Sequence, residues 1–387
     1  MSRMRVLQQI RVVDLSPYLP SQYCSFLLAQ LGAEVILVER PGQRLDIFPG
    51  LFELVNCSKK SIQLDLKSDL GREIFQRLAK SADVIVEGFR PGVASRLKIG
   101  YEDIKKIKPD MIYCSISGFG QDGPYHNKPG HDINYLALSG HFSIPGQIGI
   151  PPSRPGIPIV DLCAGMFAAF SVLAGFISRE RTGEGQYIDV AMLDVITAWN
   201  SIRAGAYLVK KERITDEHVI ATNDVFQTKD GKLIALGIVN EEHFWQNFCK
   251  AAGCEMLLED SRFSTDESRQ QNKEELSKIL RGIFIRKARE EWLQLFHSTD
   301  VPLSPVLTLE EALADPQIAH RELVEKVTDS KLGEINIVGL PAKFSGIPTE
   351  PQSPPPRAGQ HTREILEQLG YPEEVISRLE PKEGPEN

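Results

Sequence analysis

The chain has 387 residues, of which 42% are hydrophobic and 25% are charged. This composition is typical of a soluble globular protein, and the length allows more than one domain. The net charge of −8 argues against general nucleic-acid binding. The six cysteines form no CxxC pair and no Cys/His zinc spacing, so we expect reduced core cysteines, a cytoplasmic protein and no metal site.

The first half of the chain alternates strand patterns with helix patterns. Apolar runs predict strands at residues 11–16, 33–39, 61–66, 82–88 and 111–120. Helical periodicity predicts helices at 21–31 and 69–80 between them. Such alternation is typical of βαβ units, and the nearly continuous apolar strands indicate a parallel sheet that is covered on both faces. We therefore expect an α/β fold with a doubly wound sheet.

Two arginines follow predicted strands directly. Arg40 ends VILVER and Arg90 follows VIVEGF, and residues 36–110 carry a small excess of basic residues. The carboxyl ends of parallel strands share one edge of the sheet, where ligands bind, and arginine suits phosphates. This pattern indicates a small polyanionic ligand, although arginines on the surface are also common without any ligand.

The stretch from Gly118 to Gly123 reads GFGQDG and fits the GxGxxG fingerprint of dinucleotide-binding proteins. That fingerprint requires a helix to open directly after it. Pro124 follows at once instead. We therefore expect no nicotinamide or flavin site and no oxidoreductase activity.

Two residues stand where helices are predicted to begin. His131 opens the helical pattern of GHDINYLALSG (130–140), as a capping histidine, a core histidine or a base. Asp161 precedes the long uncharged run at 162–178, which predicts a buried helix rather than a membrane span. At the expected N-cap, Asp161 is either an ordinary cap or a base or nucleophile beside N–H groups that can hold an oxyanion.

The second half of the chain changes its pattern. We predict a strand at 231–239 and then helices at 241–252, 272–283, 287–297 and, after a proline-rich stretch, 361–371. These elements suggest that residues 1–200 begin a large domain, that 201–222 form a linker and that 223–300 form a smaller domain. Residues 301–380 then return to the large domain, and 381–387 are expected to be a disordered tail.

The sequence resembles a known family over most of its length. GHDINYLALSG resembles the histidine motif of α-methylacyl-CoA racemases. Other blocks resemble the family III CoA-transferase (CaiB/BaiF) superfamily, to which the racemases also belong. In chain order these blocks are RVVDLSPYLPSQYCSFLLAQLGAEVILVERPG, NCSKKSIQLDLK, ADVIVEGFRPGV, SGFGQDGP, RTGEGQYIDVAMLD and PPPRAGQHTREIL. The resemblance is dense over 10–200, thin over 200–300, and returns after 301.

The resemblance implies a fold, a substrate and a partner. The fold is a Rossmann-like large domain built from both chain ends, with a smaller α+β domain inserted between them. The substrate is an acyl-CoA thioester, so coenzyme A belongs to the substrate and no separate cofactor is expected. The partner is a second copy of the chain in an interlocked homodimer, with neither nucleic acid nor membrane involved. Lipid metabolism in the cytoplasm is the implied setting.

The resemblance also implies roles for individual residues. Asp161 matches the catalytic aspartate of the family, and His131 matches the histidine of the racemases. Glu241, or with a shifted alignment Glu242, matches a glutamate that racemases add. The positions that match contacts to coenzyme A are Tyr18, Leu19, Arg40, Leu64, Lys67, Gly88, Phe89, Arg90 and Arg96.

Two activities compete within this superfamily. A racemase needs an acid/base pair that flanks the α-carbon of the acyl group, and His131 with Asp161 meets that need. A transferase uses the aspartate as a nucleophile and commonly carries tyrosine where this chain has His131. Residues 237–246 lack the tetraglycine loop of formyl-CoA transferases, whereas NCSKKS (56–61) is closer to the transferase version of its block. We expect epimerisation of 2-methylacyl-CoA thioesters, with CoA transfer through an aspartyl-CoA thioester on Asp161 as the alternative.

Overall fold

The computed structural model describes residues 5–42, 50–347 and 353–381. Contacts within the chain divide it into two compact units. The first comprises residues 1–139, 155–200 and 319–387, and the second comprises 140–154 and 201–318. Residues 382–387 of the predicted tail, and part of the proline-rich stretch, lie outside the described residues.

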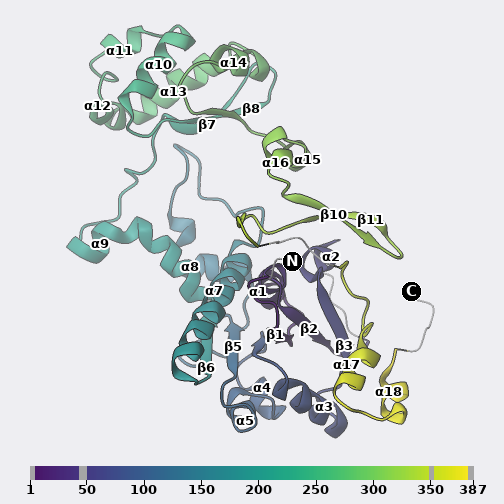
Figure 1. Cartoon of the computed structure of the whole chain (residues 1–387). Helices are drawn as coiled ribbons and strands as arrows, with labels where there is room; N and C mark the ends of the chain where they lie inside the picture. Colours follow the sequence, from purple (N-terminus) through teal and green to yellow (C-terminus); the bar gives the residue numbers. More distant parts are fainter. Residues whose placement is uncertain (1–4, 43–49, 348–352, 382–387) are drawn as a thin grey trace. The chain divides into compact units, whose positions relative to one another are not determined.

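The first unit contains a six-stranded sheet (Figure 1). Its strands are β1 (Arg11–Asp14), β2 (Glu34–Glu39), β3 (Lys59–Gln63), β4 (Val84–Glu87), β5 (Ile112–Ser117) and β6 (Gln186–Ala191). The order is β3-β2-β1-β4-β5-β6, and every neighbouring pair is parallel. This confirms the predicted α/β fold with a parallel sheet. The chain runs outward from β1 to β3 and then crosses to β4, so the strand order reverses between β1 and β4.

Helices cover both faces of this sheet. On one face, α1 (Leu19–Gln30) and α7 (Ile159–Thr182) pack against each other and against the strands. On the other face, α3 (Asp69–Lys80), α5 (Tyr101–Lys105), α17 (Thr362–Gln368) and α18 (Glu373–Leu379) close a core with side chains such as Ile36, Phe75, Ile85 and Leu366. Burial on both faces explains why the strands read as apolar runs.

The remaining elements of this unit are short. They are α2 (Leu51–Asn56), α4 (Val93–Arg96), α6 (Asp132–Leu138), α8 (Met192–Asn200) and the antiparallel ribbon of β10 (Val324–Asp329) and β11 (Gly333–Val338). By length and composition α7 is apolar enough to cross a membrane. In the structure, Val160, Ala164, Ala168 and Val172 of this helix are buried, as expected of a helix that packs on a core.

A buried lysine ties α1 and α2 to the sheet. The ammonium of Lys59 donates to Gln22 O at 2.9 Å, Ser25 Oγ at 2.7 Å and Asn56 Oδ1 at 2.9 Å. The Asp14 carboxylate lies 3.6 Å away. Burial lowers the pKa of Lys59 to about 8, against the opposing charge of Asp14. Because a buried ammonium is tolerated only when its donors are satisfied, these contacts hold α1 and α2 against the sheet.

The second unit joins a small antiparallel sheet to a helical layer. Its strands pair in the order β7 (Asn223–Gln227), β8 (Leu233–Gly237) and β9 (Leu303–Pro305). Aromatic side chains dominate its core, with Trp245, Phe248, Phe284 and Trp292 fully buried. The helical elements are η1 (His141–Ser143), η2 (Ser201–Ala204), α9 (Gly205–Lys210), α10 (Glu242–Ala252), α11 (Met256–Glu259), α12 (Asp266–Gln271), α13 (Lys273–Phe284), α14 (Arg289–Phe296), α15 (Leu309–Leu313) and α16 (Pro316–His320).

Residues 140–154 make their contacts in the second unit, although they follow α6 in the chain. Gln147 Nε2 donates to Asp224 Oδ1 at 2.6 Å, and Ile148 packs against the aromatic core. His218 Nε2 lies 2.9 Å from Pro145 O. The sequence pattern assigned this segment to the range 1–200. The predicted domain ranges themselves stay predictions, as does their arrangement.

Candidate active site

The residues predicted to contact coenzyme A lie at the carboxyl ends of parallel strands. Tyr18 and Leu19 follow β1, and Arg40 follows β2. Leu64 and Lys67 follow β3, whereas Gly88, Phe89 and Arg90 follow β4, with Arg96 in α4. Since the strands are parallel, these ends form one edge of the sheet, and β1 and β4 flank the point where the strand order reverses. Their roles in binding stay predictions.

These residues differ in burial, with Gly88 and Phe89 half-buried. The side chains of Tyr18, Arg40, Lys67, Arg90 and Arg96 are exposed. Leu19 and Leu64 are buried in the core beneath them. The exposed group can bind a ligand with its side chains, whereas the leucines can reach one only through their backbone.

Gly88 sits where two turns pass closely. A Cβ atom built at this position would lie 2.5 Å from Ser16 Oγ and 2.7 Å from Ser21 Oγ, closer than non-bonded atoms approach. The next residue, Phe89, donates its backbone N–H to Glu87 Oε2 at 2.7 Å. The absence of a side chain therefore lets the β4 turn approach the β1–α1 turn at the reversal point.

A hydrogen bond joins the beginnings of α6 and α7. Val160 N donates to Asp132 Oδ2 at 2.7 Å. His131 immediately precedes Asp132, and Asp161 immediately follows Val160. The structure therefore brings the two predicted catalytic residues to one place in the first unit. His131 is the N-cap of α6 with extended backbone, its N–H donates to Asn134 Oδ1 at 3.0 Å, and its side chain is exposed.

Asp161 is not the N-cap that the sequence pattern predicted. The cap of α7 is Pro158, so Asp161 is the third residue of the helix. Ile159 and Val160, the two residues before Asp161, already adopt helical conformation. The carboxylate that accepts the N–H of Val160 belongs to Asp132, which leaves the carboxylate of Asp161 uncommitted to capping.

In the first turn of α7, a single backbone N–H has no hydrogen-bond acceptor among the described residues. Pro158 has no N–H, Ile159 N donates to Ile157 O at 2.9 Å, and Val160 N donates to Asp132. Leu162 N donates to Pro158 O at 3.1 Å. Over the described residues, the N–H of Asp161 is the one donor of this turn without an acceptor. A donor at a helix N-terminus is suited to hold an oxyanion.

Two carboxylates share this partly closed environment. Burial first, and then the charge of Asp132, raises the pKa of Asp161 to about 7. Asp132 is buried, and no acceptor or donor meets its Oδ1 in the part of the chain that the structure describes. Two neighbouring carboxylates resist ionising together. Asp161 is therefore able to exchange a proton close to neutral pH.

Asp132 and Tyr135 also belong to this cluster, although they were not predicted from the sequence. Tyr135 is buried, and a Cβ atom at Gly118 or Gly130 would collide with its ring or hydroxyl. Burial, and then the charge of Asp161, raises the pKa of Tyr135 to about 12, while Arg90 acts in the opposite direction. The signal for both residues was their position in the histidine motif, one and four places after His131. The same geometry explains the glycine at 118 without a dinucleotide site.

Glu241 and Glu242 lie in the second unit. Glu241 is the N-cap of α10, and its Oε2 accepts from Val239 N at 3.0 Å and Asn240 N at 3.1 Å. Backbone hydrogen bonds from Glu241 itself and from Val239 lower the pKa of its carboxyl. Glu242 Oε1 pairs with Arg269 Nη2 at 2.7 Å, so that carboxylate is held inside the unit. The catalytic role of Glu241 stays a prediction.

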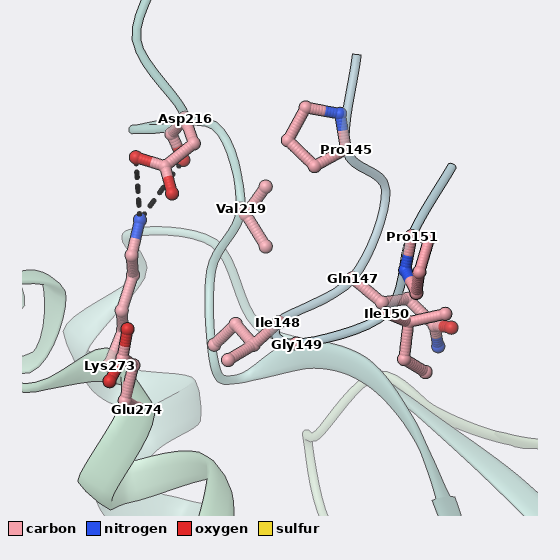
Figure 2. Close-up of a pocket in the computed structure, with 10 residues that line it drawn as sticks. All are labelled: Pro145, Gln147, Ile148, Gly149, Ile150, Pro151, Asp216, Val219, Lys273 and Glu274. Atoms are coloured by element: carbon pink, nitrogen blue, oxygen red, sulfur yellow. Dashed lines mark hydrogen bonds and ion pairs between the residues drawn. The ribbon is translucent and has the colours of Figure 1, made fainter. Parts of the chain in front are cut away.

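The second unit contains a cavity of about 290 Å³ (Figure 2). The segment Pro145–Pro151 forms one wall, and Asp216, Val219, Lys273 and Glu274 form the other. Lys273 Nζ is 3.3 Å from Asp216 Oδ1. The wall opposite this ion pair is mostly apolar. Among the described residues, none of the predicted site residues lines this cavity. A smaller cavity of about 190 Å³ in the first unit is lined by Glu87, Arg90 and Tyr187, among others.

Comparison with known proteins identifies the family. The model of CoA-transferase family III matches residues 7–362. The chain belongs to CoA-transferase family III. A succinyl-CoA:glutarate CoA-transferase of Mus musculus is 36% identical, over 97% of this chain and 89% of the relative. An α-methylacyl-CoA racemase of Homo sapiens is 32% identical, over 96% of each chain.

A solved structure supports the same assignment. The crystal structure of a CaiB/BaiF family protein from Brucella suis matches with a TM-score of 0.83 and 28% identity. The match covers 94% of this chain and 99% of that one. Membership of family III, and with it the resemblance that the motifs indicated, is therefore confirmed. The relatives of this chain include CoA-transferases at 36% and at 31% identity and an α-methylacyl-CoA racemase at 32%.

Proposed function

We propose that this member of family III epimerises 2-methylacyl-CoA thioesters by proton transfer between His131 and Asp161. The observation that supports the proposal is the hydrogen bond from Val160 to Asp132, which joins the residue before Asp161 to the residue after His131 at the starts of α6 and α7. Its chemical support is the pKa of about 7 for Asp161.

The proposed reaction has two steps. One group removes the α-proton of the thioester, which gives an enolate whose negative charge lies on the thioester oxygen. The other group returns a proton to the opposite face of the α-carbon, and the configuration is inverted. The N–H of Asp161, which has no acceptor among the described residues, is the donor placed to hold that oxygen. A pKa of about 7 leaves Asp161 in both protonation states at neutral pH, so Asp161 can remove a proton in one direction and return it in the other.

The sheet edge supplies the proposed binding site for coenzyme A. Arg40, Lys67, Arg90 and Arg96 are exposed along this edge, and Arg90 follows β4 directly at the reversal point between β1 and β4. Their positive charges suit the phosphates of the nucleotide end. Arg90 also acts electrostatically on Tyr135, which places one cation of this edge near the proposed proton-transfer groups.

CoA transfer is the second candidate, and the transferase relatives at 35–36% identity favour it. In that reaction the carboxylate of Asp161 attacks the donor thioester and releases CoA thiolate, which leaves an acyl anhydride. The thiolate then attacks the aspartyl carbonyl and releases the donor acid, which leaves an aspartyl-CoA thioester. The acceptor carboxylate attacks this thioester and expels the thiolate, which gives a second anhydride; the thiolate then attacks the acceptor carbonyl and releases Asp161 and the new acyl-CoA. Asp161 must be ionised to attack, and a pKa of about 7 leaves half of it protonated at neutral pH.

Exchange of the α-proton separates the two candidates. A single epimer of a 2-methylacyl-CoA is incubated with the protein in D₂O, without any free acid, and its α-proton is followed by NMR. We expect deuterium uptake together with formation of the second epimer. If the α-proton is retained while labelled CoA moves to an added carboxylate, epimerisation is wrong and transfer takes its place.

We also propose that the chain forms a homodimer. Met166, Phe170 and Ile177 lie along one face of α7 with 46%, 66% and 53% of their surfaces exposed. Large exposed apolar faces are typical of protein interfaces. A second copy of the chain, rather than a membrane, is the proposed occupant of this face, and a cytoplasmic location stays our prediction. Light scattering after gel filtration is expected to give twice the chain mass; the mass of one chain would contradict the proposal.

A further inference from the structure

The C-terminal part of the chain covers the outer edge of β3. Ser58 N donates to Ser353 O at 3.0 Å, and His361 N donates to Ser61 O at 2.9 Å. In return, Ser61 N donates to His361 Nδ1 at 3.2 Å. Figure 1 shows α17, which follows this segment, beside β3. Residues 353–362 are called the C-terminal clasp below, because they supply the hydrogen bonds that an edge strand otherwise lacks.

The hydroxyl of Ser61 connects the clasp to the end of β2. Gly359 N donates to Ser61 Oγ at 2.8 Å, and Ser61 Oγ donates to Glu39 Oε2. Ser61, Glu39 and Thr362 are all buried. Thr362 Oγ1 donates to Gly359 O at 2.7 Å, and this hydrogen bond stabilises the turn at residues 359–362 of the clasp. A buried carboxylate needs such donors to keep one orientation.

Gly359 adopts a conformation that other residues rarely accept. Its φ is +68°, and a Cβ atom there would lie 2.7 Å from Pro381 and 3.3 Å from Gln63. The N–H of Gly359 is therefore aimed at Ser61 by a turn that only glycine accommodates without strain. Burial lowers the pKa of His361, with Glu364 opposing and Lys60 assisting. This keeps the imidazole neutral near pH 7. A neutral imidazole is required because Nδ1 must carry no proton to accept the N–H of Ser61.

The residues in this network directly adjoin the proposed nucleotide site. Arg40 immediately follows Glu39, and Leu64 N donates to Glu39 O at 2.9 Å. Leu64 opens the turn that carries Lys67, whose N–H donates to Asp65 Oδ1 at 3.0 Å. The two exposed cations that follow β2 and β3 therefore stand on backbone whose position depends on Glu39 and Ser61.

We infer that Ser61 and His361 are positioning residues for the nucleotide end of coenzyme A: they lock the clasp onto Glu39 and thereby fix the turns that carry Arg40 and Lys67. The inference rests on the proposed binding of coenzyme A at this edge. We assign both an indirect role, since Ser61 is buried and Nδ1 of His361 accepts from the backbone of β3. Their effect is on affinity for the nucleotide, not on the proton transfer.

The test compares three probes on the full chain. Coenzyme A contains both ends of the ligand, adenosine 3′,5′-bisphosphate contains the nucleotide end, and pantetheine contains the thiol end. For Ser61→Ala we expect the affinity for coenzyme A and for the bisphosphate to fall about fivefold, with the affinity for pantetheine unchanged. Ser277→Ala is the matched control, because Ser277 is also a buried serine but lies in α13 of the second unit.

Kinetics and a conservative substitution give independent readings. With a 2-methylacyl-CoA substrate, Ser61→Ala is expected to raise KM about fivefold and to leave kcat unchanged. His361→Asn retains an acceptor for the N–H of Ser61 and is expected to bind coenzyme A like the wild type. His361→Phe fills similar space without the acceptor and is expected to behave like Ser61→Ala. If Ser61→Ala fails to fold, this second pair of variants decides the question alone.

The outcomes separate the inference from the proposed function. A wild-type chain that binds neither coenzyme A nor the bisphosphate would overturn the proposed function, and this inference with it. A wild type that binds coenzyme A, together with Ser61→Ala and His361→Phe variants that bind it equally well, would overturn this inference alone. Equal losses for coenzyme A and pantetheine would also overturn it, because a general loss of structure affects both ends.

Discussion

At the carboxyl edge of the sheet the charged side chains stand in solvent, whereas at the starts of α6 and α7 they are enclosed. Arg40, Lys67 and Arg90 are exposed over satisfied backbone turns. Asp132 is buried, and Asp161 beside it has a pKa near 7. Exposed cations cost little and attract an anionic ligand, whereas enclosed carboxylates of like charge are unfavourable unless a proton is shared. In the proposed function, the first region binds coenzyme A and the second transfers protons.

The largest expected effect comes from removing the acid/base group. Asp161→Asn keeps the size of the side chain but neither accepts nor releases a proton. We expect inversion of the α-carbon to fall at least about 1,000-fold, while affinity for coenzyme A stays within twofold of the wild type. Circular dichroism or NMR of the product measures inversion, and calorimetry measures binding. If the variant lost affinity for coenzyme A as strongly as it lost inversion, the two regions would not have separate roles.

The same substitution is expected to stabilise the fold. Because the folded-state pKa of Asp161 lies above the ordinary value, the folded chain holds a proton between about pH 4 and pH 7 that the unfolded chain has released. The wild type therefore loses stability as the pH rises through this range. Asp161→Asn avoids that loss and should be more stable by about 2 kcal/mol at pH 8, after discounting for partial exposure, with little difference at pH 4.

Denaturant unfolding at the two pH values checks this sign. Asp194→Asn, an exposed aspartate of α8, serves as the control and should change stability little at either pH. A destabilised Asp161→Asn variant at pH 8 would mean that the carboxylate is satisfied in the fold and is not under electrostatic strain.

At the sheet edge, Arg40→Ala is expected to weaken binding of coenzyme A about tenfold and to leave kcat unchanged. The loss should shrink as salt is added, because Arg40 is exposed. Lys80→Ala is the control, since it removes an exposed cation at the end of α3, away from the carboxyl edge. Equal losses from both substitutions would indicate a general charge effect and not a site at this edge.

The smallest effect is expected from Asp132→Asn. The amide oxygen still accepts the N–H of Val160, so the start of α7 is retained, but the charge beside Asp161 is gone. This lowers the pKa of Asp161, whose rise is caused first by burial and second by Asp132. The acidic limb of the pH–rate profile should move down by about half a unit. An upward shift would contradict the electrostatic coupling of the two carboxylates.

The sequence predicted those elements whose signals are local. Residues 69–80 form α3 as expected, because Ser68 caps the helix by accepting from Gly71 N and basic residues end it. β6 was missed because an edge strand with alternating exposure lacks the apolar run of its neighbours. The ribbon of β10 and β11 was missed for a similar reason, since most of its side chains are polar or exposed.

The sequence predicted those site residues whose position follows from the order of strands and helices along the chain. It missed those whose role depends on contacts between distant parts of the chain. The sequence placed Arg40 and Arg90 on one edge of the sheet because each follows a predicted strand. The alternation of strands and helices predicts that these strands are parallel, as they are in the structure. Asp132 resembled an ordinary acid in the first turn of a helix, and only the position of α7 gives it a partner. The start of α7 was placed too late, since the preference of β-branched Ile159 and Val160 for strands was overridden by packing.

The most direct test of the central claim is single-base exchange. A two-base mechanism assigns one group to each epimer, so His131→Ala and Asp161→Asn should each exchange the α-proton of one epimer in D₂O without inverting it. The two variants should act on opposite epimers, and the wild type should exchange and invert both. If the two variants impair exchange of both epimers equally, or if neither variant nor wild type exchanges the proton of either epimer, the assignment of His131 and Asp161 as the proton-transfer pair is wrong.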